Sequence, residues 1–293
     1  MAVHLTMGCS LLLLVAMFFS TAVESIPVVN SSRCNDQLAS DCRVYGNSKC
    51  YRSGSTQPAS SGQYNITLYS MRFCPYSERA RLILNAKNTR YNIINIDPYN
   101  QPAWFAGINP KKQVPSLELE NGTRIHGSLD ISVYVNENFP GIRYEHDLAK
   151  DYIITFVTEN ISKSMKILTN RTIPVNASLV DHLIDSMFKL DGMLDELRTE
   201  YFNGAVFGMT DLMIWPWFER SSAVFKRPEI ERVLDKNMAE NKYRNGLLPQ
   251  NLVNWHRKMS EEGVVSITKY GELAHERNYE THDCDSGLCD CHD

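Results

Sequence analysis

Residues 68–84 read LYSMRFCPYSERARLIL, and they place one cysteine between a predicted strand and a predicted helix. The strand is expected over 64–70, and the helix begins at Pro75, whose fixed φ suits the first helical position. Cys74 therefore occupies the N-cap, where unpaired amide donors and the positive end of the helix dipole favour a thiolate. A lone cysteine is more often a small buried residue. The strand–Cys–Pro–helix context favours a reactive thiol instead.

Alternating elements continue on the C-terminal side of this stretch. We expect a strand over 91–96, a short irregular or helical stretch over 101–107, strands over 114–119 and 124–126, and a helix over 128–138. The Asn121-Gly122 turn signal joins the last two strands. A proline that opens the third strand, facing a Cys-Pro helix start, is typical of a thioredoxin-like fold. We therefore expect the Val114–Pro115 bond to be cis.

Strand signals stop beyond Pro140-Gly141, and apolar residues then recur at helical spacing over 146–169, 178–201, 210–225, 228–237 and 249–260. The predicted fold class is an α/β thioredoxin-like N-terminal domain followed by an all-α C-terminal domain. The expected divisions are a signal peptide (1–25), a Cys-containing extension without its own core (26–62), the thioredoxin-like domain (63–140), the helical domain (145–265) and a Cys-rich tail (266–293). After about residue 270 we expect no regular structure except where disulfides hold the chain.

The first 25 residues have the character of a secretory leader. Residues 10–20 read SLLLLVAMFFS, an apolar run too short to span a bilayer comfortably, and small residues offer cleavage after Ala22 or Ser25. An uncleaved membrane anchor is the alternative, because no Lys or Arg precedes this run. The formal net charge of −4 indicates no nucleic-acid partner. We expect a secreted, extracellular protein with no stable membrane span.

Cysteine usage agrees with secretion. Of the 8 cysteines, Cys9 leaves with the leader, and Cys74 is kept free for chemistry. The others are Cys34, Cys42, Cys50, Cys284, Cys289 and Cys291. They suffice for three disulfides, whose connectivity stays open. A soft-metal site in the tail is the alternative, but the spacing there matches no zinc template, so we expect no metal.

Glycosylation sequons also favour passage through the secretory pathway. The sequence carries Asn-x-Ser/Thr at Asn30, Asn65, Asn121, Asn160, Asn170 and Asn176. Asn121 lies in a hairpin signal and is expected at an exposed tip. Asn65 adjoins a core strand, so its use is the doubtful one.

With these residues in view, the chain resembles an omega-class glutathione transferase. The matching blocks are LYSMRFCPYSERARLIL (68–84), QPAWF and NP (101–105, 109–110), VPSLE (114–118) and MIWPWFER (213–220). The resemblance covers about residues 64 to 262, and it implies the two-domain fold described above. It also implies a homodimer, with glutathione as co-substrate.

The resemblance implies that Cys74 attacks disulfides or oxidised substrates and passes through a mixed disulfide with glutathione. A dithiol site would need a second thiol three positions on, where this chain has Ser77. An external thiol must therefore resolve the intermediate. Thiol transfer and dehydroascorbate reduction are the implied reactions, with small oxidised or disulfide molecules as substrates.

The glutathione-binding residues follow from the same resemblance. Val114 matches the position whose backbone pairs with the cysteinyl part of glutathione, and Ser128 matches the residue that binds the γ-glutamyl carboxylate, where a helix N-terminus also favours an anion. Two positions depart from the family. Gly127 stands where an acidic residue would pair with the glutathione amino group, and Gln101 where a lysine would approach the glycyl carboxylate. We therefore expect weaker glutathione binding, unless Lys111, Lys112, His126 or Asp130 substitutes.

Three arginines flank the nucleophile: Arg72, Arg79 and Arg81. They either add positive potential that favours a thiolate and an anionic substrate, or they are solvated charges on a helix surface. The second interpretation is favoured for each arginine alone.

The aromatic run Trp215, Trp217 and Phe218 has two interpretations as well. It lines a second-substrate pocket, or it packs a core, and the core interpretation is favoured. Asp211 is expected to cap the start of this helix. Only half of a capping box survives, because the usual hydroxyl position holds Gly208.

The leading functional hypothesis is a secreted glutathione-dependent thioltransferase or dehydroascorbate reductase. A secreted binding protein that keeps the fold but has lost efficient glutathione chemistry is the alternative. An ion-channel-like relative with the same Cys-Pro site is less favoured, because of the MIWPWFER block and the lack of a later membrane segment.

Overall fold

The computed structural model describes residues 50–58, 64–240, 249–270 and 272–281. The expected signal peptide, most of the Cys-containing extension, the end of the tail and Asn30 lie outside these ranges. The chain divides into two compact units. The thioredoxin-like unit contains the described residues up to Glu145 and those from Glu262 onward, and the helical unit contains His146–Glu261. Each unit is described by itself.

The thioredoxin-like unit is built on a mixed four-stranded sheet in the order β2-β1-β3-β4. Its strands are β1 (Thr67–Ser70), β2 (Asn92–Asn95), β3 (Ser116–Glu118) and β4 (Arg124–His126). The central strand β1 pairs parallel with β2 and antiparallel with β3, and β3 pairs antiparallel with β4. The predicted order of strands and helices is therefore confirmed, with shorter strands than the sequence indicated.

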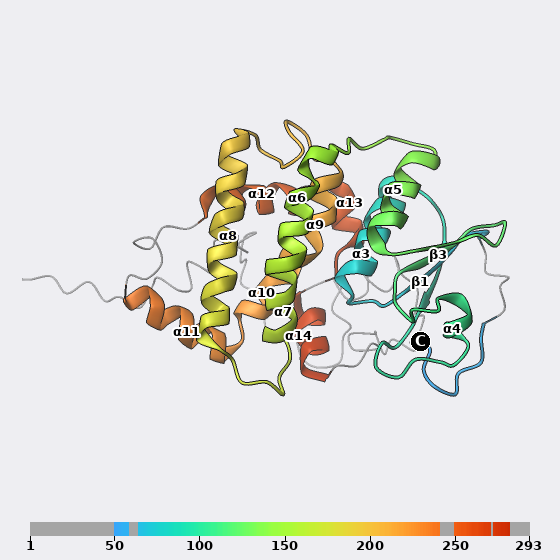
Figure 1. The fold of residues 1–293 in the computed structure, drawn as a ribbon, viewed down its shortest axis with the longest axis horizontal. Coiled ribbons are helices and arrows are strands. Elements are labelled where there is room, and N and C mark those ends of the chain that lie inside the picture. The colour runs from blue at the N-terminus through green and yellow to red at the C-terminus, as the bar shows by residue number, and fades with distance from the viewer. Residues whose placement is uncertain (1–49, 59–63, 241–248, 271, 282–293) are drawn as a thin grey trace, which may run out of the picture. The chain divides into compact units, whose positions relative to one another are not determined.

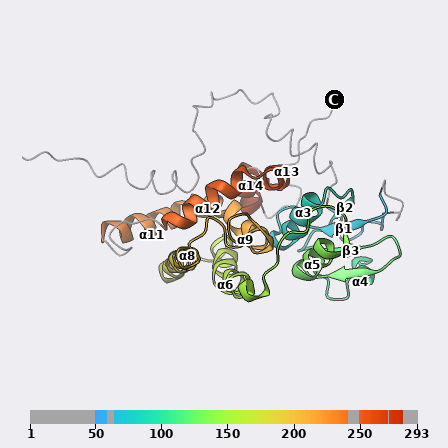
Figure 2. The ribbon, with the colours of Figure 1, turned by 90° about the horizontal axis from the view of Figure 1, so that it is seen from above.

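Helices cover both faces of this sheet. On one face, α3 (Pro75–Ala86) and α5 (Ser128–Asn138) lie side by side (Figures 1 and 2). On the other face, the short helix α4 (Phe105–Ile108) packs its two end residues against Tyr69 and Ile96. The Val114–Pro115 bond that opens the third strand is cis, as predicted.

Part of the N-terminal extension, which was expected to have no core of its own, packs onto the core of the thioredoxin-like unit. Cys50 is buried, and Tyr51 forms a parallel bridge with Ile96 just beyond β2. The Tyr51 N–H donates to the Asn95 carbonyl at 2.8 Å, and the Tyr51 ring meets Trp104 edge-on at 5.8 Å between centroids. These contacts add an extra chain segment to the β2 edge of the sheet.

The segment after residue 262 also folds onto the thioredoxin-like unit. It forms α13 (Gly263–Thr268), which packs against α3, and α14 (Glu272–Thr281). The Asn85 amide donates to the Thr268 hydroxyl at 2.8 Å. The expectation of no regular structure after residue 270 is wrong for 272–281. The His275 ring of α14 meets the Phe73 ring at 5.7 Å between centroids, a contact between distant segments that the local sequence pattern cannot show.

The helical unit follows the predicted apolar spacing, with more interruptions than predicted. Its elements are the 3₁₀ turn η1 (Leu148–Lys150), α6 (Asp151–Phe156), the π-helical η2 (Val157–Ser162), α7 (Lys163–Leu168), α8 (Ala177–Leu197), α9 (Met209–Glu219), α10 (Ser221–Phe225), α11 (Pro228–Ala239) and α12 (Gln250–Glu261). The stripe on α8 is buried at Leu183, Met187, Leu190 and Leu194. Within the described ranges, no helix combines the length and the apolar character that crossing a bilayer requires.

The core of the helical unit is built around the start of α9. Trp215, Trp217 and Phe218 are all buried, which confirms that they pack the core. The carboxylate of Asp211 accepts from the N–H groups of Phe202, Asn203 and Gly208 and from the Trp255 indole, at 2.8–3.1 Å. Burial raises the pKa of Asp211, against the effect of these hydrogen bonds. The predicted half of the capping box is therefore present.

Candidate active site

Cys74 stands where the loop after β1 enters α3. Its backbone is extended (φ −74°, ψ 120°), and it is the N-cap of a helix that has Pro75 in its first turn. The sulfur makes no capping hydrogen bond to the helix. Among the described cysteines it is the free one, and its side chain is half-buried. The site therefore presents a thiol next to helix-start amides that no side chain of the N-cap uses.

Arg81 stabilises the loop that leads to Cys74 through hydrogen bonds to it. This guanidinium donates to the Arg72 carbonyl at 3.0 Å, to the Ser70 hydroxyl at 3.2 Å and to the Met71 carbonyl at 3.4 Å. Arg81 is fully buried, and Arg72 is also buried. The favoured interpretation of these two arginines as solvated surface charges is therefore wrong. Both are buried, and the Arg81 guanidinium binds the backbone of the loop that contains Arg72.

Ser77 strengthens the same loop and accounts for the missing second thiol. Its hydroxyl oxygen, fully buried, accepts from the Met71 N–H at 3.2 Å. The position that would hold a resolving cysteine therefore supports the backbone in front of Cys74. On α3 the described residues offer Cys74 no second thiol.

An apolar cluster adjoins the nucleophile. It consists of Cys50, Met71, Phe73 and Tyr270, with Cys74, Ile93 and Val114 packed against it. The Phe73 and Tyr270 rings lie 5.6 Å apart between centroids. Cys50 is disulfide-bonded, and its partner lies outside the described residues. The predicted site residues Cys74 and Val114 thus pack against the same cluster. The sequence did not predict that Cys50 and Tyr270 would belong to it.

Ser128 is joined to the nucleophile's helix by Arg79. An Arg79 Nη donates to the Ser128 hydroxyl at 3.4 Å, and the guanidinium lies 5.6 Å from the centre of the Tyr76 ring. Arg79 is 1% exposed. Burial lowers the pKa of Arg79 to about 9, and the charges of Tyr76 and Cys74 oppose this lowering. One buried cation therefore connects the start of α3 with the start of α5.

Sequence reasoning missed Arg79 because it treated each arginine separately. A usable signal was present: four of the five residues in the segment ARLIL that follows are apolar, which indicates a helix buried on more than one side. Residues Ser77 to Leu84 are indeed all buried. A charged residue inside such a run needs partners within the protein.

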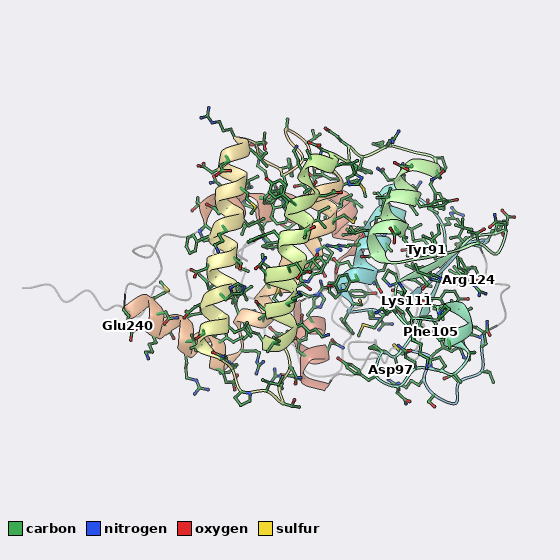
Figure 3. All side chains as sticks on the ribbon, viewed as in Figure 1. Tyr91, Asp97, Phe105, Lys111, Arg124 and Glu240 are labelled. Carbon is green, nitrogen blue, oxygen red and sulfur yellow. The ribbon has the colours of Figure 1, made fainter. Side chains whose placement is uncertain are left out.

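The two departures from the family pattern have clear positions. The Gln101 amide donates to the Lys112 carbonyl at 2.8 Å, so one of its donors is used within the chain. Lys111, labelled in Figure 3, is exposed, and its N–H donates to the Asn109 side chain at 3.0 Å. Gly127 is the N-cap of α5, with φ +92°, and it is exposed. The described residues contain no group of three His, Cys, Asp or Glu side chains able to hold a metal ion.

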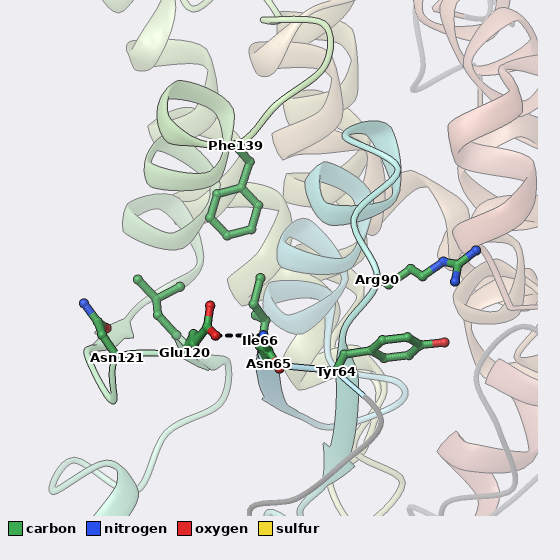
Figure 4. Close-up of a pocket in the computed structure, with 8 residues that line it drawn as sticks. Tyr64, Asn65, Ile66, Arg90, Glu120, Asn121 and Phe139 are labelled. Carbon is green, nitrogen blue, oxygen red and sulfur yellow. Dashed lines mark hydrogen bonds between the residues drawn. The ribbon is translucent and has the colours of Figure 1, made fainter.

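A separate pocket of about 730 Å³ contains none of the predicted site residues (Figure 4). It is lined by Tyr64, Asn65, Ile66, Arg90, Leu119, Glu120, Asn121 and Phe139. The Asn65 amide donates to Glu120 at 2.8 Å across it. This hollow is a feature of the opposite end of β1 from Cys74, since Tyr64 to Ile66 precede that strand.

Comparisons with known proteins agree with this fold. The family model for the glutathione S-transferase N-terminal domain matches residues 68–143. Glutathione S-transferase omega-1 of Sus scrofa is 34% identical over 184 residues, which cover 61% of this chain and 76% of that relative. Among solved structures, glutathione transferase Omega 1C from Trametes versicolor matches 78% of this chain and 99% of its own, with a TM-score of 0.59 at 20% identity. Rice GST1, solved in complex with glutathione, matches 75% of this chain and 99% of its own, with a TM-score of 0.60 at 15% identity.

Proposed function

Because this chain belongs to the omega class of glutathione transferases, we propose that it is an extracellular glutathione-dependent thioltransferase and dehydroascorbate reductase. The observation that carries the proposal is Cys74, a free and half-buried thiol at the N-cap of α3, with Ser77 where a second thiol would stand. A single thiol at a helix start suits exchange through a mixed disulfide. Glutathione is the co-substrate.

The reaction proceeds in two exchanges. The Cys74 thiolate attacks the glutathione sulfur of a mixed disulfide, the S–S bond breaks, and the other sulfur leaves with the electron pair as a thiolate. A second glutathione thiolate then attacks the Cys74–glutathione disulfide, which releases oxidised glutathione and restores the Cys74 thiolate. With dehydroascorbate, two glutathione molecules supply two electrons and two protons, and they leave as oxidised glutathione.

Three residues bind glutathione in this proposal. The Val114 backbone pairs with its cysteinyl part, and the Ser128 hydroxyl and the first amides of α5 bind the γ-glutamyl carboxylate. The contact from Arg79 to Ser128 supports this role, because a hydroxyl that accepts from the guanidinium directs its own proton elsewhere. Gln101 contributes at the glycyl end with the donor that Lys112 leaves unused.

Extracellular action rests on the leader sequence, the cysteines and the sequons. The side-chain oxygens of Asn121, Asn170 and Asn176 each accept from the N–H two residues on, at 2.9–3.0 Å. The first two sequons lie in turns, and Asn176 is the N-cap of α8. Turns at a surface suit glycan attachment. Secretion from cultured cells, followed by mass analysis before and after glycan removal, tests this part. Retention of the whole product inside the cells, without glycans, contradicts it.

A secreted binding protein with weak glutathione chemistry is the second candidate. Two observations favour it: the Gln101 amide is already engaged by Lys112, and Gly127 has no side chain. Lost charge-assisted hydrogen bonds each cost about 1.5–3 kcal/mol.

One experiment separates the two candidates. The parent protein and the Cys74→Ala variant are incubated with oxidised glutathione, weighed intact, and assayed for disulfide and dehydroascorbate reduction. The enzyme proposal requires a glutathione adduct and activity in the parent and neither in the variant. Activity that survives in Cys74→Ala removes Cys74 from the mechanism. A parent with neither adduct nor activity supports the binding protein.

The Ser77→Cys variant sharpens the assignment of a single-thiol mechanism. A second thiol at this position can attack the Cys74–glutathione disulfide from within the protein. The adduct is then expected to disappear, with an internal disulfide in its place. Persistence of the adduct in this variant contradicts the proposed proximity of position 77 to the Cys74 sulfur.

A further inference from the structure

The start of α5 holds a carboxylate next to the expected glutathione site. Gly127, the N-cap, has φ +92° and therefore a conformation that side chains rarely adopt. A Cβ placed on Gly127 would lie 3.0 Å from Oδ2 of Asp130. The carboxylate of Asp130 thus occupies the space beside Gly127 that a side chain at position 127 would enter.

This carboxylate does not cap α5 or pair with another side chain in the described part of the chain. An acid at the third position of a helix commonly accepts from the N-cap N–H. Here the Gly127 N–H donates to the Pro115 carbonyl at 3.4 Å instead. The Asp130 side chain makes no hydrogen bond or ion pair with any residue that the structure describes, and it is exposed. Its negative charge is therefore available to a ligand.

The chemistry of the ligand requires such a charge. This step rests on the proposed function, in which the γ-glutamyl end of glutathione meets Ser128. That end carries a carboxylate and an ammonium on the same carbon, so a group that binds the first brings the second within a few ångströms. The carboxylate suits Ser128 and the amides of α5, whereas the ammonium needs an anion.

The other residues considered from the sequence do not supply that anion. Lys111 and Lys112 are cations, and they repel an ammonium. The Nδ1 of His126 lies at hydrogen-bond distance, 3.1 Å, from the Ser116 hydroxyl. Gly127 has no side chain. We propose that Asp130 binds the α-ammonium of the γ-glutamyl group and so favours ligands that carry this ammonium over ligands that lack it.

A cycle of protein and ligand changes tests this assignment. S-methylglutathione and its analogue without the α-amino group are titrated by calorimetry into the parent, Asp130→Asn and Glu137→Gln. The thioether excludes thiol exchange, and Glu137 is an exposed acid at the far end of the same helix. In Asp130→Asn we expect about tenfold weaker binding of S-methylglutathione and unchanged binding of the desamino analogue. Glu137→Gln is expected to bind both ligands like the parent.

The outcomes separate this assignment from the proposed function. Unchanged affinity in Asp130→Asn, or an equal loss for both ligands, overturns the role of Asp130. Intact mass analysis of the same variants with oxidised glutathione reports on Cys74 independently. If the parent forms the Cys74 adduct while the cycle shows no coupling, Asp130 is excluded and the proposed function stands. If the parent forms no adduct and binds neither ligand, both fail.

Discussion

The helices that begin at Pro75 and at Met209 both open on an unusual N-cap, and they treat their polar groups in opposite ways. At α9 the Asp211 carboxylate accepts from backbone N–H groups on two chain segments and from an indole, all in a buried setting. At α3 the Cys74 sulfur makes no capping hydrogen bond and is half-buried. The polar side chain at the start of α9 is thus fully hydrogen-bonded, and we call this a saturated start. The Cys74 sulfur at the start of α3 makes no capping hydrogen bond, and we call this an open start.

This difference separates a structural helix start from a chemical one. A saturated start stabilises the fold, since each of its partners loses a hydrogen bond when it is removed. An open start contributes little to stability but can bind or attack an incoming group. Mutations at α9 should therefore change unfolding, and mutations at α3 and α5 should change reactivity.

The largest effect is expected from Cys74→Ala. Removal of the nucleophile should lower thioltransferase activity by about a thousandfold or more. The free energy of unfolding should change by less than about 1 kcal/mol, because the sulfur makes no hydrogen bond to the helix. Turnover assays and urea unfolding monitored by circular dichroism measure the two quantities. A large loss of stability in this variant would place Cys74 among the structural residues and break the comparison.

Asp211→Asn should have the next largest effect, and on stability alone. The amide cannot accept from all the donors that the carboxylate serves, so unfolding should become easier by about 3 kcal/mol. Cys74 alkylation in the folded protein should be unchanged. The control is Asp185→Asn, an exposed aspartate of α8, which should unfold like the parent. If Asp211→Asn unfolds with the same urea midpoint as the parent, the hydrogen bonds of Asp211 do not stabilise the fold as described.

The stability difference between the parent and Asp211→Asn should also depend on pH. Burial raises the pKa of Asp211 in the folded state. The contribution of a carboxyl with a raised pKa is fully present below its unfolded pKa and is lost as pH rises through the folded value. The advantage of the parent should therefore shrink as the pH rises from the ordinary aspartate pKa upward. Urea midpoints measured across this range check the sign, and a growing advantage would reverse it.

The sequence was sufficient where the physical signal is local. Pro75 at a helix start, the Asn121-Gly122 turn and the apolar stripe on α8 each depend on neighbours a few residues away, and each produced a correct element. The position of Cys74 at the N-cap follows from the same kind of signal. The cis Val114–Pro115 bond was predicted from its place at a strand start in this strand order.

The remainder depends on contacts between distant segments, which no local pattern encodes. Tyr270 packs on Phe73, and Tyr51 pairs beyond the edge of β2, so neither end of the chain could be placed from composition alone. For Arg79 the local run of apolar residues indicated burial but could not show the partner of its charge. A charge on a helix is solvated unless a second element covers it, and the covering serine at 128 is far away in sequence.

Arg79→Lys tests whether Arg79 couples the reactivity of Cys74, at the start of α3, to ligand binding at Ser128, at the start of α5. Lysine keeps a cation but loses the planar guanidinium that reaches Ser128. We expect S-methylglutathione to bind about tenfold more weakly and Cys74 to be alkylated more slowly by iodoacetamide. Arg90→Lys, at an exposed arginine, is the matched control. A variant that loses thermal stability while keeping both the affinity and the alkylation rate would assign Arg79 to the fold alone.

Ser128→Ala should have the smallest effect and divides the start of α5 into its two parts. The hydroxyl supplies one hydrogen bond, whereas the backbone amides of α5 remain, so glutathione binding should weaken about fivefold. Stability should fall only slightly, because Arg79 loses one long contact of 3.4 Å. Calorimetry with S-methylglutathione gives the affinity. An effect as large as that of Arg79→Lys would mean that the Ser128 hydroxyl, rather than the α5 amides and the buried Arg79, binds the γ-glutamyl carboxylate. The start of α5 would then depend on a side chain, as the start of α9 depends on Asp211.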